Sequence, residues 1–427
     1  MTVESHLLCS LKPWLDAPAW RVAFSGGLDS TVLLTALVRL RQQHRLPPLS
    51  AVHVHHGLQA VADSWPAHCA KICDGLGVPL EVVPVQVAAG ASIERAARVA
   101  RYKAFAERLG EGEVLLMAQH QDDQAETLLF RMLRGAGVRG LGAMPISRAL
   151  GQGKLVRPLL AIDRADLESY ARAQELEWIE DPSNASLVHS RNYLRHQVMP
   201  VLKQRWPRAP SSMARTAAHL AEAQSLLDEL AEMDLLAARA PDDWPWLPLR
   251  SLDLAVLRSL SSARQRNALR HWLADFTLLP DTDHWAGWEA LRDAAVDATP
   301  RWRLEGGELH RAGRRLWWLS GPWLEAVAGA FPLERRVTTL ALAGNGAVSL
   351  EGAMQGAFEI RYRQGGESMT VPGRGRRDLK RLLNEAQMPG FVRSRLPLLY
   401  LDGELIAIAN LPQFDVALVS LVWTPPA

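Results

Sequence analysis

The chain has 427 residues and a formal net charge of only +2, with 48% hydrophobic and 22% charged residues. This composition is ordinary for a soluble globular protein and excludes a disordered chain, and the length predicts two or three domains. No apolar run reaches the about 18 residues that cross a bilayer, and residues 1–18 lack the basic start and apolar core of a secretory signal, so we expect a cytoplasmic protein with no membrane partner.

Short apolar runs alternate with helical patterns over the first 200 residues. We expect strands at residues 21–24, 49–55, 80–85 and 114–118, and helices at residues 30–42, 92–109 and 122–134. Gly135 is placed to close the last of these helices. Strands that alternate with helices predict an α/β fold, with a parallel sheet covered by helices on both faces. Ligands of such sheets bind at the carboxyl ends of the strands, so the residues after each strand are the first candidates for a site.

The remaining chain predicts two further domains after a catalytic domain at residues 1–208. Residues 209–335 are expected to form a mainly helical central domain, with helices at residues 212–239, 262–276 and 285–296 and a hairpin of residues 302–304 and 314–319. Nine of the fifteen tryptophans lie there, which favours a packed aromatic core over a base-stacking platform. Residues 336–427, with strands at 358–363 and 398–401 around a helix at 379–386, predict a small α+β domain.

The strongest chemical signal lies between the first expected strand and the first expected helix. It is the hexapeptide Ser25-Gly26-Gly27-Leu28-Asp29-Ser30. Glycines let backbone N–H groups approach a phosphate closely, and the start of a helix adds partial positive charge. Asp29 would repel a phosphate unless a cation bridges them, which suggests Mg²⁺. The spacing excludes a P-loop and a dinucleotide fingerprint, while an ordinary serine-capped turn is the structural alternative.

The hexapeptide resembles the signature of the ATP-pyrophosphatase (PP-loop) superfamily. The resemblance implies that these six residues grip the pyrophosphate end of ATP and that AMP is transferred to an oxygen of the substrate. A second motif, His53-Val54-His55-His56-Gly57-Leu58, ends the second strand. We expect His53 to contact adenine or ribose, with a structural histidine as the alternative.

A cluster of carboxylates follows the fourth expected strand. Asp122, Asp123 and Glu126 share one helical turn directly after His120. The helix dipole explains part of this pattern. Three carboxylates at the carboxyl end of a strand also predict a site for Mg²⁺ or for a cationic substrate such as lysine. We expect Asp29, Asp122 and Asp123 to be the metal ligands if a metal binds, with His120 and Glu126 beside them.

Basic residues gather in blocks that contain few or no acidic residues. Such local positive surface predicts contacts with the phosphates of a nucleic acid, and solvated helix faces are the alternative. The predicted contacts are Arg98, Arg131, Arg134, Arg139, Arg191, Arg195, Arg374, Arg376, Arg377, Lys380 and Arg381.

Several longer segments resemble one family within the superfamily, the tRNA(Ile)-lysidine synthetases. They are HVHHGL, ERAARVARYKAF, AHQDDQAETLLFRMLRGAGVRGLGAMP, RPLL, WIEDPSN, RNYLR and the C-terminal GRGRRDLKRLLNEAQMPGFVRSRLPLL. Gln59 stands where the family usually has arginine, and Ala143 stands in a glycine position. The sequence therefore does not decide whether the family's basic contact at position 59 is made, nor which shape the loop around Ala143 takes.

The resemblance implies a reaction that uses ATP and Mg²⁺. The C2 oxygen of the wobble cytidine of an isoleucine tRNA with a CAU anticodon attacks the α-phosphate, and the ε-amine of L-lysine then displaces AMP. The product, lysidine, changes codon and aminoacylation identity. A PP-loop tRNA thiolase, which would use reactive cysteines among Cys9, Cys69 and Cys73, is the main alternative, and a non-catalytic RNA-binding protein is another. The sequence leaves the oligomeric state open, with a homodimer as one alternative.

Overall fold

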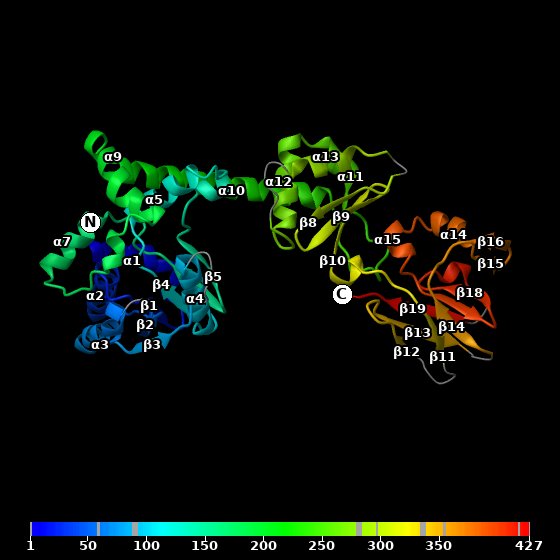
Figure 1. Ribbon diagram of the computed structural model, residues 1–427, viewed down its shortest axis with the longest axis horizontal. Helices are drawn as coiled ribbons and strands as arrows, with labels where there is room; N and C mark the ends of the chain where they lie inside the picture. The colour runs from blue at the N-terminus through cyan, green and yellow to red at the C-terminus, as the bar shows by residue number, and fades with distance from the viewer. Residues whose placement is uncertain are drawn as a thin grey trace. The chain divides into compact units, whose positions relative to one another are not determined.

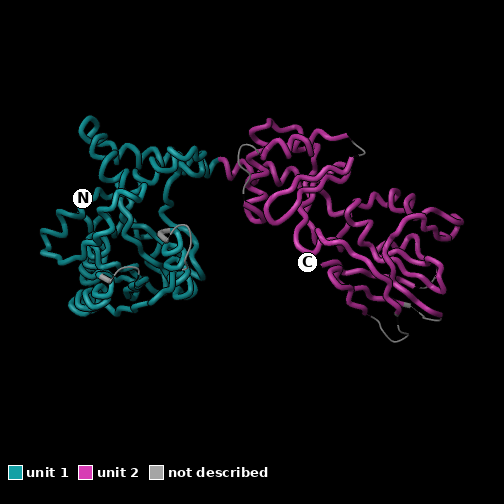
Figure 2. Tube along the Cα trace, in the orientation of Figure 1, with its two compact units in different colours: residues 1–226 teal, residues 227–427 magenta. Residues whose placement is uncertain are grey.

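The computed structural model describes residues 2–57, 60–87, 93–278, 284–295, 298–333, 339–352, 356–416 and 419–426. It forms two compact units, residues 1–226 and 227–427, which meet within helix α10 (Ala209–Ala237) (Figure 2). The finer division at residues 208 and 335 stays a prediction. Four residues of the expected features lie outside the described residues: Leu58 and Gln59 in and after the second motif, and Ser92 and Val296 at the ends of two expected helices.

Unit 1 is built on a six-stranded sheet with the order β3-β2-β1-β4-β6-β5 (Figure 1). The strands are β1 (Trp20–Ala23), β2 (Leu49–His55), β3 (Leu80–Pro84), β4 (Val114–Leu116), β5 (Ser147–Leu150) and β6 (Gly153–Val156). All neighbours pair in parallel except β5, which returns antiparallel to β6. The predicted α/β fold is therefore confirmed, although the β5–β6 hairpin was not anticipated.

Helices cover both faces of this sheet. They are α1 (Val3–Leu11), α2 (Leu28–Gln43), α3 (Trp65–Leu76), α4 (Ile93–Glu107) and α7 (Arg164–Ala173). Successive side chains of a strand point to opposite faces. Val114 and Leu116 accordingly pack in the core formed with α1, α2 and α7, whereas Leu115 packs in the core that contains Phe105 of α4. The alternating burial fixes the sheet as the middle layer of three.

The order of the strands locates the place where ligands bind in such sheets. From β1 the chain proceeds to β2 and β3 on one side, and then crosses back to β4 on the other side of β1. The loops after β1 and β4 therefore diverge at the carboxyl edge, and this switch point is where open α/β sheets bind ligands. The first loop leads into α2, and the second leads into α5 (Gln121–Met132).

A layer of short helices packs over α5. Its members are α6 (Val138–Leu141), α8 (Ser190–Tyr193), the π-helical segment η4 (Leu194–Val198), α9 (Met199–Arg205) and the start of α10. Leu194 and Met199 pack against Ala125 and Leu129 of α5 in one small apolar core. Residues 190–205 are thereby held next to the helix that starts at the carboxyl edge of the sheet.

The first part of unit 2 combines helices with a four-stranded antiparallel sheet. The helices are α11 (Leu254–Ser259), α12 (Ser262–Leu273) and α13 (Trp285–Asp293), and the strands are β7 (Ser251–Asp253), β8 (Arg301–Leu304), β9 (Gly307–Ala312) and β10 (Arg315–Ser320). The predicted hairpin is wrong in its pairing, because β9 lies between the two expected strands in the order β7-β10-β9-β8. Trp285, Trp288, Trp302, Trp317 and Trp318 are buried, which confirms the packed aromatic core.

The C-terminal part of unit 2 is a β-rich fold with two short helices. Its strands are β11 (Ala330–Leu333), β12 (Thr339–Ala341), β13 (Ala347–Gly352), β14 (Phe358–Arg361), β15 (Ser368–Val371), β16 (Gly375–Asp378), β17 (Leu398–Leu401), β18 (Glu404–Ile408) and β19 (Val419–Thr424). The helices are α14 (Leu379–Glu385) and α15 (Gly390–Arg393). Among the helices described in either unit, none is both long enough and apolar enough to cross a membrane.

Candidate active site at the switch point

Residues 25–30 form a tight loop between β1 and α2, which we call the phosphate cradle. Gly26 has a φ of 79°, and a Cβ added to it would lie 2.9 Å from both Cys69 Sγ and Ile179 Cδ1. Glycine is therefore required here for its left-handed backbone and for the close approach of two neighbours. α2 begins at Leu28 and its N-cap, Gly27, has no side-chain cap. The first N–H groups of this long helix are left for a ligand, as an anion site requires.

Hydrogen bonds within the loop hold the cradle in shape. The hydroxyls of Ser25 and Ser30 are 3.0 Å apart, and Ser30 Oγ donates to the Gly27 carbonyl at 3.0 Å. A segment distant in sequence braces the loop from outside, because Ile179 N donates to the Gly26 carbonyl at 2.8 Å. Ile179 belongs to the segment WIEDPSN, which in sequence shows only a resemblance to a family motif. A parallel β-bridge also joins Gly27 to Ile179, so this segment supports the backbone of the cradle.

His53 lies behind the cradle and is only 3% exposed. Its Nδ1 lies 2.9 Å from the Phe24 carbonyl, which accepts, so Nδ1 carries the proton. Burial lowers the pKa of His53, and the neutral ring then presents Nε2 as an acceptor. Nε2 has no hydrogen-bond partner among the described residues. The predicted contact with adenine or ribose stays a prediction, and Nε2 is the atom available for it.

His120 joins the two loops of the switch point. It is 1% exposed, and its Nε2 lies 3.7 Å from Asp29 Oδ2 and 3.5 Å from Asp123 Oδ2. Burial raises the pKa of the Asp29 carboxyl, while the neighbouring His120 opposes that rise. The structure thus brings Asp29 from the cradle together with the residues that follow β4.

Asp122, Asp123 and Glu126, which we call the acid cluster, are paired with cations of the chain itself. Arg195 donates to Glu126 Oε1 at 2.7 Å and to Asp123 Oδ1 at 2.8 Å. Arg191 donates to Glu126 Oε2 at 3.1 Å and to Asp123 Oδ1 at 3.0 Å. The side chain of Glu126 is only 3% exposed, so its charge depends on these two partners. Arg191 and Arg195 were predicted to bind RNA, and that role stays a prediction beside this internal one.

Asp122 has a different set of partners. Its Oδ1 accepts from Lys203 Nζ at 2.7 Å, and its Oδ2 accepts from the backbone N–H of Arg164 at 3.1 Å. Burial would raise the pKa of Asp122, but the hydrogen bonds from Lys203 and Arg164 outweigh it and leave the pKa below its ordinary value. Neither partner was found from the sequence, because Lys203 is 81 residues away and the Arg164 contact is made by backbone.

The donor atoms bear on the predicted Mg²⁺ site. Asp29 Oδ1 is buried and has no hydrogen-bond partner in the described structure, so it is free to bind a cation. Asp122 already uses both carboxylate oxygens, and Asp123 Oδ2 also accepts from the backbone N–H of His120 at 3.1 Å. Within the described ranges no group of three acidic, histidine or cysteine side chains has the geometry of a metal site. Asp29 therefore fits a Mg²⁺ held mainly by phosphate oxygens, and the metal assignment of Asp122 and Asp123 stays a prediction.

Arg131 has a structural contact within unit 1. Its Nη1 donates to the carbonyls of Gly140 and Ala143 at 2.8 and 2.7 Å. Ala143 has a φ of 51°, in the region that favours glycine. The loop thus keeps a glycine-like shape at the position where Ala143 departs from the family pattern that the chain resembles, and Arg131 holds it there.

The other predicted RNA contacts lie on the surface. Arg134 is exposed over the ring of Phe130, Arg139 is exposed, and Arg98 Nη2 donates to the Tyr102 hydroxyl at 3.2 Å. In unit 2, Arg374 and Arg381 share Glu385 at 2.7 and 3.4 Å, and Arg376 Nε donates to Ser368 Oγ. Arg376, Lys380 and Arg381 are exposed and Arg377 is half-buried. Their role in RNA binding stays a prediction.

Comparison with known proteins places this site in a family. A PP-loop domain matches residues 2–202, a TilS substrate binding domain matches residues 252–317, and a TilS substrate C-terminal domain matches residues 358–416. A tRNA(Ile)-lysidine synthase of Pseudomonas fluorescens is 61% identical over 97% of this chain and 94% of its own length. One of Pseudomonas aeruginosa is 59% identical over 99% and 97%, and one of Escherichia coli O157:H7 is 40% identical over 91% of each. The chain belongs to the tRNA(Ile)-lysidine synthase family.

Proposed function

We propose that this chain uses ATP to join lysine to C2 of the wobble cytidine in an isoleucine tRNA with a CAU anticodon. The observation that carries the proposal is the 61% identity to a curated lysidine synthase along almost the whole length of both chains. The geometry supports it independently, because the phosphate cradle and the acid cluster meet at the switch point of the sheet.

In the first proposed step, the C2 oxygen of the cytidine attacks the α-phosphorus of ATP, and the bond to the β-phosphate breaks. The N–H groups at the start of α2 and the backbone of the cradle hold the pyrophosphate as charge builds on it. His53 Nε2 is proposed to accept a hydrogen bond from the nucleoside. The chain's main contribution is to place the two reacting groups together.

Asp29 is proposed to hold Mg²⁺ together with the phosphates. When bound, the ion neutralises the phosphate oxygens and makes pyrophosphate a better leaving group. The buried, unpartnered Oδ1 of Asp29 supports this role. His120, whose Nε2 lies 3.7 Å from Asp29 Oδ2, helps to orient that carboxylate.

In the second proposed step, the ε-amine of lysine attacks C2 of the cytidine. The bond between C2 and the activated oxygen breaks, AMP leaves with that oxygen, and the amine loses a proton. We propose that the acid cluster recognises the cationic substrate. Because Arg191, Arg195 and Lys203 already occupy its oxygens, an incoming ammonium must share or displace one of these partners. Lys203, whose side chain is 42% exposed, is the most accessible of the three.

A PP-loop tRNA thiolase is the less supported alternative. Such an enzyme would need a reactive thiolate, but burial raises the pKa of Cys69 to about 12 and that of Cys73 to about 11. Thiols with such values are poor nucleophiles at neutral pH. Cys9 is exposed but lies on α1.

The proposal is tested by incubating the purified chain with labelled lysine and isoleucine tRNA bearing the CAU anticodon, with and without ATP. ATP-dependent transfer of label into the RNA supports the ligase. Pyrophosphate release without lysine transfer would support the adenylation step and show that lysine is not the nucleophile. A methionine tRNA with the same anticodon is the matched control. We further propose a cytoplasmic location, and a homodimer is a separate proposal that sedimentation velocity decides.

A further inference from the structure

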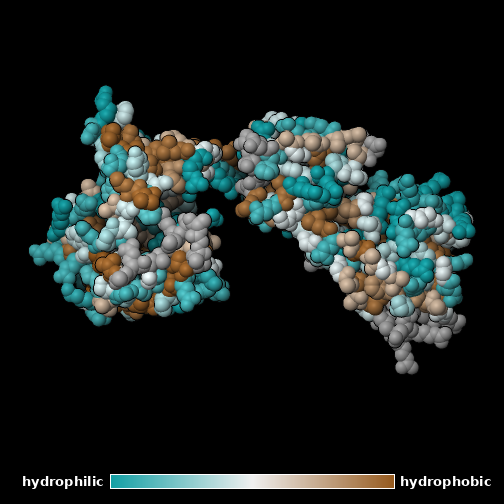
Figure 3. Space-filling model, viewed as in Figure 1, coloured by the Kyte–Doolittle hydropathy of each residue, from teal (hydrophilic) through white to brown (hydrophobic). Residues whose placement is uncertain are grey.

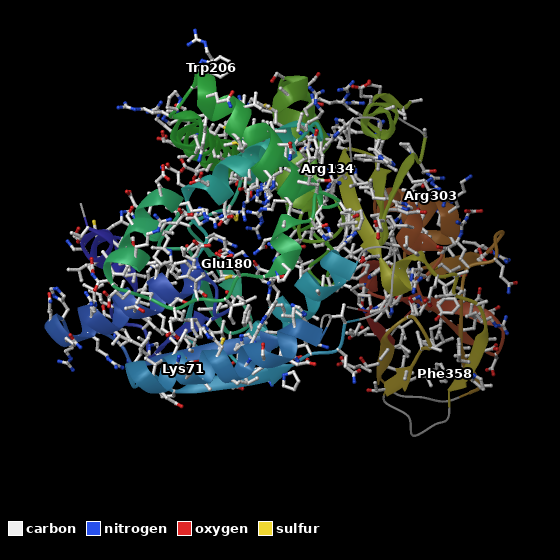
Figure 4. All side chains as sticks on the ribbon, turned by 60° about the vertical axis from the view of Figure 1, so that its left-hand side comes forward. Lys71, Arg134, Glu180, Trp206, Arg303 and Phe358 are labelled. Carbon is white, nitrogen blue, oxygen red and sulfur yellow. The ribbon has the colours of Figure 1, made fainter. Side chains whose placement is uncertain are left out.

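The junction between α9 and α10 carries an exposed tryptophan beside a cavity. Trp206 directly follows α9 and is 59% exposed, and Figure 4 shows it at the tip of that helix, pointing away from the body of the unit. The cavity measures about 670 Å³, and Leu202, Pro207 and Met213 contribute to its mainly apolar lining. That volume lies within the range of roughly 300–1,000 Å³ that holds ligands. Trp206 shares this lining with Leu202, Pro207 and Met213, so its indole belongs to an apolar patch and is not an isolated exposed side chain. Exposed apolar patches mark surfaces for interaction.

Arginines without acidic partners surround this tryptophan. The guanidinium of Arg205 lies 6.0 Å from the centre of the Trp206 ring, and Arg208 lines the same cavity. Both side chains are exposed, and neither forms an ion pair within the described part of the chain. Residues 182–221 contain no aspartate or glutamate at all. Figure 3 shows hydrophobic and hydrophilic residues side by side over α9 and the start of α10.

Residues 182–221 also supply the cations that pair with the acid cluster, so this segment contains both paired and unpaired cations. Arg191, Arg195 and Lys203 form ion pairs with carboxylates of the acid cluster. Arg205 and Arg208, in contrast, form no ion pair with a carboxylate of the described residues. An aromatic ring flanked by uncompensated arginines complements a polyanion that carries flat rings, which is the chemistry of a nucleic acid strand.

Contacts within unit 1 fix this surface next to the candidate site. Lys203 on α9 donates to Asp122 at the start of α5 with a distance of 2.7 Å. Leu202 and Met213, which line the cavity, also pack against the apolar core that contains Leu129 of α5. Helix α9 therefore connects this surface directly to the acid cluster that is proposed to recognise lysine.

We propose that this elbow, formed by Leu202, Arg205, Trp206, Pro207, Arg208 and Met213, is a contact for the substrate RNA. An unpaired base stacks on the indole of Trp206, and Arg205 and Arg208 bind the adjoining phosphates. The inference rests on the proposed function in naming a tRNA as the RNA. Phosphate contacts position the strand, and stacking accepts any base, so the elbow contributes affinity more than sequence selection.

The test measures binding of isoleucine tRNA with a CAU anticodon to the full chain over a series of salt concentrations. Trp206→Ala is expected to weaken binding by roughly 5- to 150-fold, the loss that a stacked base implies, and Trp206→Phe to retain most of the affinity. The double variant Arg205→Gln, Arg208→Gln should lower the slope of log affinity against log salt by about two. Arg45→Gln, at an exposed arginine after α2, is the matched control and should bind as the wild type does.

Unchanged affinity in Trp206→Ala, together with an unchanged salt slope in the double variant, would overturn the proposal. If Trp206→Ala instead abolishes self-association in sedimentation velocity while RNA affinity stays the same, the elbow is a face between two copies, and the proposal is again wrong. Thermal unfolding of each variant checks the fold. Wild-type chain that binds the tRNA without transferring lysine would refute the proposed function alone, because the binding comparison still decides the role of the elbow.

Discussion

Gly26→Ala is the substitution that tests the phosphate cradle most sharply. The new methyl group would lie 2.9 Å from Cys69 Sγ and Ile179 Cδ1, at a backbone φ of 79°. The left-handed backbone costs about 1–2 kcal/mol and overpacking a well-filled site costs about 1–3 kcal/mol, so we expect a total of about 2–5 kcal/mol. To relieve this strain, the side chains of Cys69 and Ile179 or the loop itself must shift. A shift of the loop would weaken the 2.8 Å hydrogen bond from Ile179 N to the Gly26 carbonyl and displace the N–H groups that are proposed to hold the phosphates.

Gly77→Ala is the matched control for this experiment. Gly77 closes α3 with a φ of 63°, and an added Cβ would meet nothing within 4 Å. It therefore carries the backbone cost of about 1–2 kcal/mol without the steric one. For a unit of this size each kcal/mol lowers the melting temperature by roughly 2–4 °C. We expect Gly26→Ala to melt below Gly77→Ala and to bind ATP about tenfold or more weakly by calorimetry. Equal melting temperatures and wild-type ATP binding in both variants would refute the account of the cradle.

Three further predictions concern the acid cluster and the cysteines. Glu126→Gln leaves Asp123 as the counter-charge of Arg191 and Arg195, which are partly exposed, so it should destabilise unit 1 by about 1–3 kcal/mol; an unchanged melting temperature would contradict this. The pKa of Asp122 is lowered in the fold, so its contribution to stability is present above the ordinary aspartate pKa and is lost as the pH falls through the folded value. Urea denaturation across the acidic range should show this loss in the wild type and less of it in Lys203→Met, and identical pH profiles would count against the Lys203 contact. Replacing Cys9 by serine and Cys69 and Cys73 by alanine should leave lysine transfer intact, and its disappearance in a folded variant would reopen the thiolase alternative.

The cradle could be predicted from sequence because its chemistry is local. Two glycines, two serines and an aspartate follow an apolar run and open a helical pattern, and each residue acts through its own backbone or a neighbour a few positions away. The same holds for Gly135, whose φ of 72° closes the helical segment as expected. Local signals of this kind can be recognised in the sequence without knowledge of the tertiary structure.

The partners of the acid cluster could not be predicted, because they are distant in the chain. Arg191 and Arg195 lie 65 to 72 residues from the carboxylates they bind. In the sequence, Arg191 and Arg195 are typical of a basic surface. The packing of η4 and α9 on α5 directs their side chains to the acid cluster. The wrong hairpin has a related cause, since β9 contains glutamate, histidine and arginine and lacks the apolar run that marked its neighbours.

If the intermediate is an adenylated base, the oxygen at C2 of the wobble cytidine must leave with AMP. A tRNA made with a heavy oxygen isotope at C2 of that cytidine tests it directly, when it is incubated with ATP, lysine and the purified chain. We expect to find lysine in the RNA and the heavy isotope in the released AMP by mass spectrometry. AMP without the isotope, or a lysine-bearing RNA that retains it, would contradict the adenylated base as the intermediate.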